Sequence, residues 1–209
     1  MGISMSDSKL AELVRMIGAW PGLVSGPPAE LVDDSLVLLD FLGDARSLVD
    51  VGSGGGLPGL PLKLARPDLH VTLIESDQSK AAFLVRAAAR LLLTDVEVVG
   101  RPAEEVGRDP RYRESFDVAV ARALAPMPVL AELCLPLVRV GGRLLAQKTA
   151  REEISRATHA IELLGGSLDA VADAHSQARN EGTVVIVRKV AATPAEYPRR
   201  PGVPRRRPL

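Results

Sequence analysis

Residues 47–59 read SLVDVGSGGGLPG, and this stretch decides how the rest of the chain is interpreted. The run Ser47–Val51 is mostly apolar and shows no polar face, which is typical of a strand buried on both sides. Five of the eight residues in 52–59 are glycine. Glycine costs backbone entropy, so a turn this rich in it is typical of a loop that a ligand approaches closely. We therefore expect a ligand site directly after a buried strand.

Strand and helix patterns alternate on both sides of this loop. The expected strands after Ser47–Val51 cover residues 70–75, 96–99, 116–121 and 142–148. The expected helices begin in the N-terminal region, with Ser6 as the first cap, and cover residues 10–17, 28–43, 58–65, 77–93, 103–106, 128–137 and 151–164. The last two apolar runs, 168–174 and 183–190, have no helical pattern between them and predict an antiparallel pair. We expect an α/β fold: a doubly wound sheet of about seven strands, mostly parallel, with an antiparallel C-terminal hairpin and N-terminal helices.

Two glycine patterns overlap in the loop. Gly54–Gly59 matches the dinucleotide fingerprint G-x-G-x-x-G, but it begins three residues after the strand end. Counted from the strand end, the pattern is an acid followed by alternating glycines: Asp50, Gly52, Gly54 and Gly56. An acidic residue there repels a pyrophosphate and suits S-adenosylmethionine, which carries an ammonium and a sulfonium but no phosphate. Electrostatics therefore favour S-adenosylmethionine over NAD.

Two further acidic residues follow the next two strands. Glu75 ends the second strand, where a carboxylate can accept both hydroxyls of a ribose. Glu104 follows the third strand, beside backbone groups that can bind an adenine edge. Each has a simpler interpretation, a solvated charge for Glu75 and a helix N-terminal acid for Glu104. Their joint placement with the glycine loop, at the ends of three successive strands, favours a cofactor site.

Composition excludes several classes of protein. The 209 residues are 46% hydrophobic and 25% charged, which is typical of a single globular unit with a true core. One cysteine, Cys134, excludes a disulfide framework, and the three histidines show no metal-ligand spacing, so we expect no metal. We see neither a signal peptide nor a long apolar segment. We expect a soluble, cytoplasmic monomer with no membrane contact.

The formal net charge of zero conceals an uneven distribution. Residues 193–209 carry five arginines and one glutamate, a net charge of +4, and the rest of the chain carries −4. The terminus is either a solvated tail or an arm that binds phosphate backbones by releasing their counterions. We divide the chain into an N-terminal helical segment (1–45), a cofactor-binding domain (46–192) and a basic Pro/Arg-rich tail (193–209).

Four segments together resemble the RsmG/GidB family of bacterial 16S rRNA guanine-N7 methyltransferases. They are Leu48–Leu62, Ala121-Arg122-Ala123, Gln147-Lys148 and the terminal Tyr197–Leu209. The resemblance implies a class I methyltransferase fold, S-adenosyl-L-methionine as cofactor, and small-subunit rRNA or the 30S particle as partner. It also implies which residues contact the cofactor: Gly52, Leu57, Ala103, Glu104 and Arg122.

The chemistry that the resemblance implies needs no general base, because guanine N7 carries an in-plane lone pair and no proton. The enzyme supplies alignment and electrostatics. We expect Arg122 to shape the cofactor pocket and donate to guanine O6 or a phosphate, and Lys148 to contact a second phosphate. The expected RNA contacts of the tail are its arginines, Arg199, Arg200, Arg205, Arg206 and Arg207. Deleting residues 198–209 should then weaken RNA binding and leave cofactor affinity unchanged.

Two alternative functions remain open. The region before residue 34 departs from the family pattern, since Glu30-Leu31 stands where an Arg-His pair is usual. The departure concerns how the substrate is held. It leaves room for a paralogue that methylates another RNA or a small molecule, and for a non-catalytic RNA- or ribosome-binding protein that keeps the fold.

Overall fold

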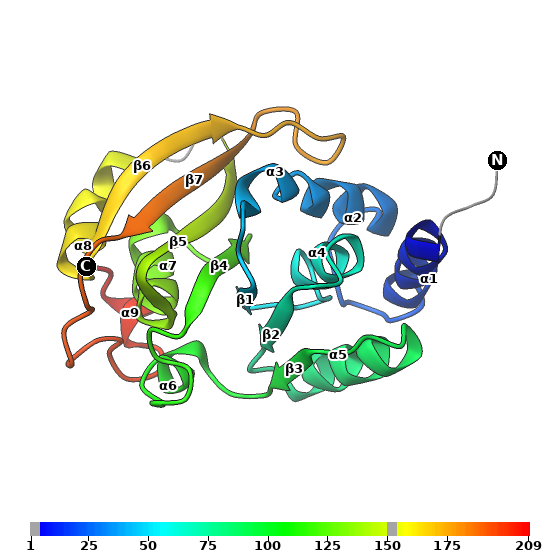
Figure 1. Ribbon diagram of the computed structural model, residues 1–209, viewed down its shortest axis with the longest axis horizontal. Coiled ribbons are helices and arrows are strands. Elements are labelled where there is room, and N and C mark those ends of the chain that lie inside the picture. The colour runs from blue at the N-terminus through cyan, green and yellow to red at the C-terminus, as the bar shows by residue number, and fades with distance from the viewer. Residues whose placement is uncertain (1–4, 150–153) are drawn as a thin grey trace.

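The computed structural model describes residues 5–149 and 154–209, and within these residues one sheet has seven strands in the order β3-β2-β1-β4-β5-β7-β6 (Figure 1). Strands β1 to β5 pair in parallel, and β7 pairs antiparallel with both β5 and β6. The strands are β1 (Ser47–Val51), β2 (His70–Ile74), β3 (Val96–Val99), β4 (Phe116–Arg122), β5 (Val138–Thr149), β6 (Gly166–Asp173) and β7 (Gly182–Lys189). The expected doubly wound sheet with an antiparallel hairpin is confirmed. The chain order reverses between β1 and β4, which places a ligand crevice beside the loop after β1.

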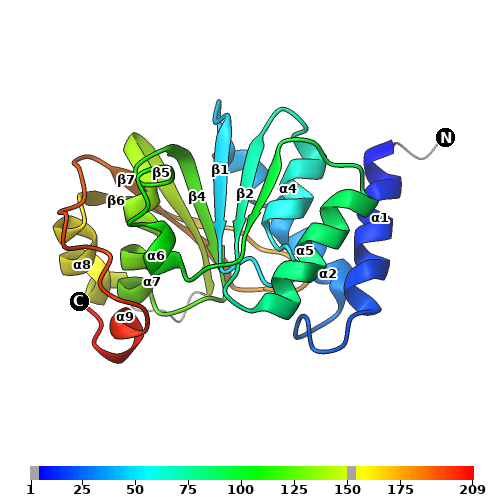
Figure 2. The ribbon, with the colours of Figure 1, turned by 90° about the horizontal axis from the view of Figure 1, so that it is seen from below.

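Helices cover both faces of the sheet, and Figure 2 shows the two groups on opposite sides. One face carries α1 (Met5–Gly18), α2 (Pro28–Leu36), α3 (Leu39–Leu42), α4 (Gly59–Ala65) and α5 (Gln78–Arg90). The other carries α6 (Ala103–Val106), α7 (Met127–Cys134) and α8 (Thr158–Leu163), with α9 (Val203–Arg206) against α7. Two 3-10 helices, Leu135–Leu137 and Ile154–Ala157, lie on this second side.

The two faces are separate hydrophobic cores, because successive side chains of a strand point to opposite sides. In β1, Leu48 packs into the core under α1–α5, whereas Val49 packs into the core under α6–α8. In β5, Leu145 and Leu144 divide in the same way. Asp50 follows this alternation and shares the face of Leu48, so its side chain lies toward α4.

The N-terminal helices differ from the expectation in two places. The helix expected over 28–43 is broken into α2 and α3 at residues 37–38. Ser6 lies inside α1 instead of capping it, and its hydroxyl donates to the carbonyl of Leu64 at 3.2 Å. The start expected at Arg151 lies outside the described residues. Asp77 caps α5 as expected, accepting the N–H of Lys80 at 3.0 Å.

The C-terminal tail packs against the body. Arg113 donates to the carbonyls of Thr193 at 2.7 Å and Tyr197 at 2.8 Å. Arg108 donates to the carbonyl of Pro198 at 2.6 Å. The tail ends in a short helix, α9, that the sequence pattern did not predict. Arginines of the body therefore hold residues 193–198 against it through their backbone carbonyls. No helix in the described parts of the chain is long and apolar enough to span a bilayer.

Candidate functional site

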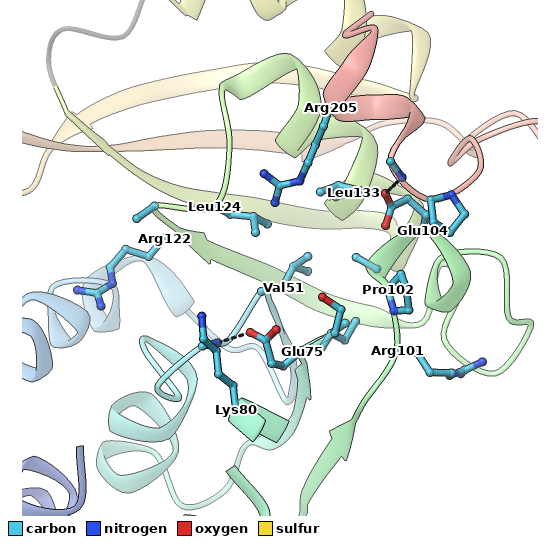
Figure 3. Close-up of a pocket in the computed structure, with 18 residues that line it drawn as sticks. Val51, Glu75, Lys80, Arg101, Pro102, Glu104, Arg122, Leu124, Leu133 and Arg205 are labelled. Atoms are coloured by element: carbon cyan, nitrogen blue, oxygen red, sulfur yellow. Dashed lines mark hydrogen bonds between the residues drawn. The ribbon is translucent and has the colours of Figure 1, made fainter. Parts of the chain in front are cut away.

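A cleft of about 460 Å³ opens at the carboxyl ends of β1, β2 and β4; we call it the first cleft (Figure 3). Four segments form its walls: the glycine loop, the end of β2, the turn after β3 and the end of β4. A fifth contribution comes from the C-terminal tail, through Pro201, Gly202 and Arg205. The volume lies within the range of pockets that bind small molecules.

The glycine loop takes backbone angles that favour glycine at Gly52 and Gly54, and at Gly52 a side chain would not fit. Gly52 has φ +73°, and a Cβ there would lie 2.4 Å from Cδ1 of Leu124. The backbone N–H groups of Gly52 and Ser53 both donate to the carbonyl of Ile74, at 2.9 and 3.0 Å, and hold the turn. At Gly54, φ is +53° and a Cβ would have only the Gly52 carbonyl oxygen within 4 Å, at 3.9 Å. The space beside Gly54 lies in the cleft and lets a ligand approach the backbone closely.

Glu75 faces the first cleft and also fixes the loop. One carboxylate oxygen accepts the N–H of Gly54 at 2.9 Å, and the other accepts the N–H of Asp77 at 2.8 Å. The side chain is largely buried but lines the cleft. Each carboxylate oxygen retains capacity for a further donor, so Glu75 can still accept the two hydroxyls of a ribose.

Glu104 lies at the far end of the same cleft, with Ala103 beside it. Its Oε1 accepts the N–H of Gly202 from the tail at 3.0 Å. The expected convergence of the glycine loop, Glu75 and Glu104 is therefore found in the structure.

Asp50 and Gly56, both expected to contact the cofactor, do not line the first cleft. Asp50 is fully buried beneath the loop, where its Oδ2 accepts the N–H of Gly59 at 2.9 Å. Burial raises the pKa of Asp50 to about 7, and its Oδ1 has no hydrogen-bond partner among the described residues. A Cβ on Gly56 would lie 2.3 Å from Cδ1 of Leu60, so this glycine serves the turn. The acids that face the cleft are thus Glu75 and Glu104.

Arg122 ends β4 and borders three hollows. Its side chain, 14% exposed, lines the first cleft and extends to Asp34 of α2, with 3.5 Å between Nη1 and Oδ2. Burial lowers the pKa of Arg122, and the Asp34 carboxylate opposes this effect. The Asp34 carboxylate therefore holds the charged Arg122 guanidinium where the clefts share their lining.

A second cleft of about 370 Å³ joins the first at the glycine loop and Arg122. Its apolar wall contains Leu23, Leu31 and Leu57, and its polar wall contains Arg122 and Arg179. Leu57, expected at the cofactor, lies in this second cleft. The two clefts share four lining residues, Gly52, Gly54, Arg122 and Ala123, and we call the two clefts together the groove.

Lys148 lies near the end of β5, beside Arg122, around a third depression that Gln147 and Arg179 also line. Its Nζ donates to the carbonyl of Ala125 at 2.5 Å. The two basic residues expected to position the substrate therefore border the same surface.

One element of this groove was not predicted. Arg179, in the loop between β6 and β7, donates through Nε to both carboxylate oxygens of Asp34, at 2.8 and 3.1 Å. Ser176 donates to the same carboxylate at 2.5 Å, and Nε2 of Gln147 donates to the Asp34 carbonyl at 2.7 Å. The segment 174–181 has no periodic pattern, so its sequence held no signal for this contact.

The five tail arginines do not form one surface. Arg199 makes a bidentate ion pair with Glu132, which is fully buried in α7. Arg205 lines the first cleft. Arg200, Arg206 and Arg207 are exposed. Because Pro201, Gly202 and Arg205 line the first cleft, deleting the tail would also remove part of the cleft wall.

The residues that the structure describes contain no group arranged to bind a metal, and their one thiol is buried. No group of three or more His, Cys, Asp or Glu side chains in those residues is arranged to hold a metal ion. Cys134 is buried, and burial raises the pKa of its thiol. Cys134 is therefore a core residue.

Comparison with known proteins places this chain among rRNA methyltransferases. The family model of GidB, described as rRNA small subunit methyltransferase G, matches residues 27–181. A protein of Pelotomaculum thermopropionicum named ribosomal RNA small subunit methyltransferase G is 48% identical over 181 residues, 84% of this chain and 76% of that protein. One of the same name from Geobacillus sp. (strain WCH70) is 43% identical and covers 100% of this chain and 94% of that protein.

Solved structures agree on the fold. An S-adenosylmethionine-dependent methyltransferase of Aquifex aeolicus superimposes with a TM-score of 0.61 at 17% identity, over 90% of this chain and 100% of that one. A 16S rRNA methyltransferase of T. thermophilus, solved with AdoMet and guanosine, gives a TM-score of 0.55 at 16% identity, over 78% of this chain and 40% of that one. At these identities the likeness concerns the class I methyltransferase fold alone.

Proposed function

The chain belongs to the GidB family, rRNA small subunit methyltransferase G, and on this premise we propose that it methylates N7 of a guanine in small-subunit ribosomal RNA. S-adenosylmethionine is the methyl donor. The observation that carries the proposal is a pair of adjacent clefts, of about 460 and 370 Å³, that share Arg122 and the glycine loop.

The residues of the first cleft fit S-adenosylmethionine. The space above Gly54 admits a ligand against the backbone, which a side chain there would fill. The Glu75 carboxylate is placed for a ribose, and Ala103 and Glu104 are placed for an adenine. Bound there, S-adenosylmethionine supplies an electrophilic methyl group.

The protein contributes alignment and charge. Guanine N7 already has a free lone pair, so no side chain has to remove a proton. Arg122, held by Asp34 at the junction of the clefts, can donate to guanine O6 and orient the base in its plane. Lys148, on the adjoining surface, can hold a phosphate of the same strand. Correct orientation of the two reactants removes much of the barrier to such a displacement.

The exposed arginines of the tail extend the basic surface for RNA. Arg200, Arg206 and Arg207 are exposed, do not line the first cleft and are available to phosphates. We further propose that a monomer acts on the rRNA or on the 30S particle, and that it does so in the cytoplasm.

The test is a map of methylated nucleosides. The purified protein, S-adenosylmethionine and unmodified small-subunit RNA, free or assembled into subunits, are incubated and digested, and the nucleosides are identified by mass spectrometry. We expect 7-methylguanosine at one position with the wild type and a much smaller yield with Arg122→Lys. A different methylated nucleoside, or none in either RNA form, would refute the proposal.

A further inference from the structure

The C-terminal tail brings a cationic side chain into the first cleft. Arg205 lies in α9 and, with Pro201 and Gly202, lines the cleft. Figure 3 shows its side chain extending from α9 into the cleft toward Leu124, on the side opposite Glu75. The neighbouring residue Gly202 contacts Glu104, at the end of the cleft where a nucleoside base is expected.

The position of Arg205 is set by contacts on both sides of it in the sequence. Before it, Arg199 is paired with the buried Glu132, with 2.5 Å between Nη2 and Oε2. The Gly202 N–H donates to Glu104 at 3.0 Å, and Pro204 is buried. The helix that carries Arg205 is therefore docked through a buried ion pair and through a residue of the cleft itself.

The guanidinium of Arg205 is available for a ligand. Arg101 is paired with Asp109 at 2.9 Å, and Arg122 lies 3.5 Å from Asp34. Within residues 5–149 and 154–209, the Arg205 guanidinium makes no hydrogen bond or ion pair with a carboxylate or a carbonyl. A planar guanidinium is weakly hydrated and stacks well on aromatic rings, so it suits the face of a purine.

We propose that Arg205 is a cofactor-binding residue, which contacts the adenosine part of S-adenosylmethionine and makes the tail a wall of the adenosine subsite. The role goes beyond the proposed rRNA methylation and rests only on the identity of the cofactor. It separates Arg205 from its neighbours Arg206 and Arg207, which are exposed as Arg205 is but do not line the cleft.

The test is calorimetric titration of the RNA-free protein with three ligands: S-adenosylmethionine, S-adenosylhomocysteine and methylthioadenosine. The last lacks the amino-acid part but keeps the adenosine. We expect Arg205→Ala to weaken all three by about fivefold to tenfold, as loss of a cation–π contact implies. Arg205→Lys keeps the charge without the planar fork and should recover part of the loss. Arg206→Ala, a matched change one residue away, should bind all three within about twofold of the wild type.

A second variant tests the docking of the tail. Arg199→Ala removes the pair with Glu132 outside the cleft, and we expect it to weaken the three ligands in the same pattern. Equal affinities for Arg205→Ala and Arg206→Ala would overturn the proposal. The proposal would also be overturned if Arg205→Ala lost affinity only for S-adenosylmethionine and S-adenosylhomocysteine, the two ligands that carry an amino-acid part. Since no RNA is present, failure here is distinct from failure to methylate rRNA, and unchanged thermal unfolding of Arg205→Ala shows that the fold is intact.

Discussion

Arg122, at the end of β4, and Asp34, in α2, approach to 3.5 Å between Nη1 and Oδ2. Arg179 binds the same carboxylate from the β6–β7 loop. Asp34 is almost completely buried, so one carboxylate balances two guanidinium groups from distant parts of the chain. It joins the N-terminal helices and the hairpin to the strand that borders both clefts.

Replacing Asp34 with alanine should destabilise the protein strongly. The change leaves two largely buried guanidinium groups without their common counter-charge, and such a loss costs about 3–5 kcal/mol. Urea unfolding measures it. The control is Asp169→Ala, which removes an exposed pair with Arg188 and should cost less than about 1 kcal/mol. Similar losses of unfolding free energy in the two variants would mean that the buried Asp34 carboxylate contributes no more to stability than an exposed ion pair.

Replacing Arg122 with lysine should reduce turnover more than it reduces cofactor affinity. The charge remains, but the planar fork that can orient a guanine through O6 is lost. We expect kcat to fall at least about tenfold, and the Kd for S-adenosylmethionine to change by less than about threefold. Single-turnover methylation and calorimetry measure the two quantities. An unchanged kcat would mean that Arg122 only stabilises the fold and does not orient the guanine.

The sequence predicted the sheet and the two acids of the cleft, because strand ends can be read from apolar runs and parallel strands end at one edge. It misassigned Asp50, although the alternation of side chains could have placed it: Asp50 shares the face of Leu48 and lies beneath the loop. Arg179 and Arg205 could not be located in the same way. Both lie in segments without periodicity, and their positions depend on docking to Asp34 and Glu132, far away in the chain.

Replacing Gly54 with alanine should impair cofactor binding more than folding. Its φ of +53° makes the change cost about 1–2 kcal/mol, and the added methyl group would occupy the open space of the cleft. We expect the Kd for S-adenosylmethionine to rise more than about tenfold, measured by calorimetry, since the methyl group removes the close approach that glycine allows.

Gly22→Ala is the matched control for that prediction. Gly22 has φ +73°, no atom lies within 4 Å of an added Cβ, and the residue lines neither cleft. It should lose similar stability and keep its cofactor affinity. Equal affinity losses in the two variants would indicate a global effect and contradict a ligand above Gly54.

Replacing exposed arginines of the tail should weaken RNA binding and leave cofactor affinity unchanged. In the double variant Arg206→Ala/Arg207→Ala, two candidate phosphate contacts disappear and the first cleft keeps its lining. Each lost contact should reduce the slope of log K against log salt by about 1. Filter binding of rRNA over a salt series measures the slope, and calorimetry with S-adenosylmethionine provides the control. An unaltered slope would remove these two arginines from the RNA surface.

Asp50→Asn should change how stability depends on pH. The pKa of Asp50 is about 7 in the folded protein, because burial disfavours its charge, whereas an unfolded Asp ionises near 3.8. Between these values the folded state holds a proton that the unfolded state has released, so this group contributes stability at low pH that is lost as the pH rises to 7. Asparagine does not titrate and can still accept the Gly59 N–H. The stability of the variant relative to the wild type should therefore increase by on the order of 4 kcal/mol between pH 4 and 7, measured by urea unfolding.

Asp117→Asn provides a control of opposite sign. Asp117 accepts a hydrogen bond from Arg139 and others from the N–H groups of Arg46 and Ser47, and these hold its pKa down at about 2, although burial opposes them. Its charged form stabilises the fold above the unfolded pKa, and that contribution is lost as the pH falls toward 2. The stability of this variant relative to the wild type should therefore decrease as the pH rises from 2 to 4 and then remain constant. If the curves of Asp50→Asn and the wild type ran parallel from pH 4 to 7, Asp50 would be ionised in the folded protein throughout that range, and burial would not have raised its pKa.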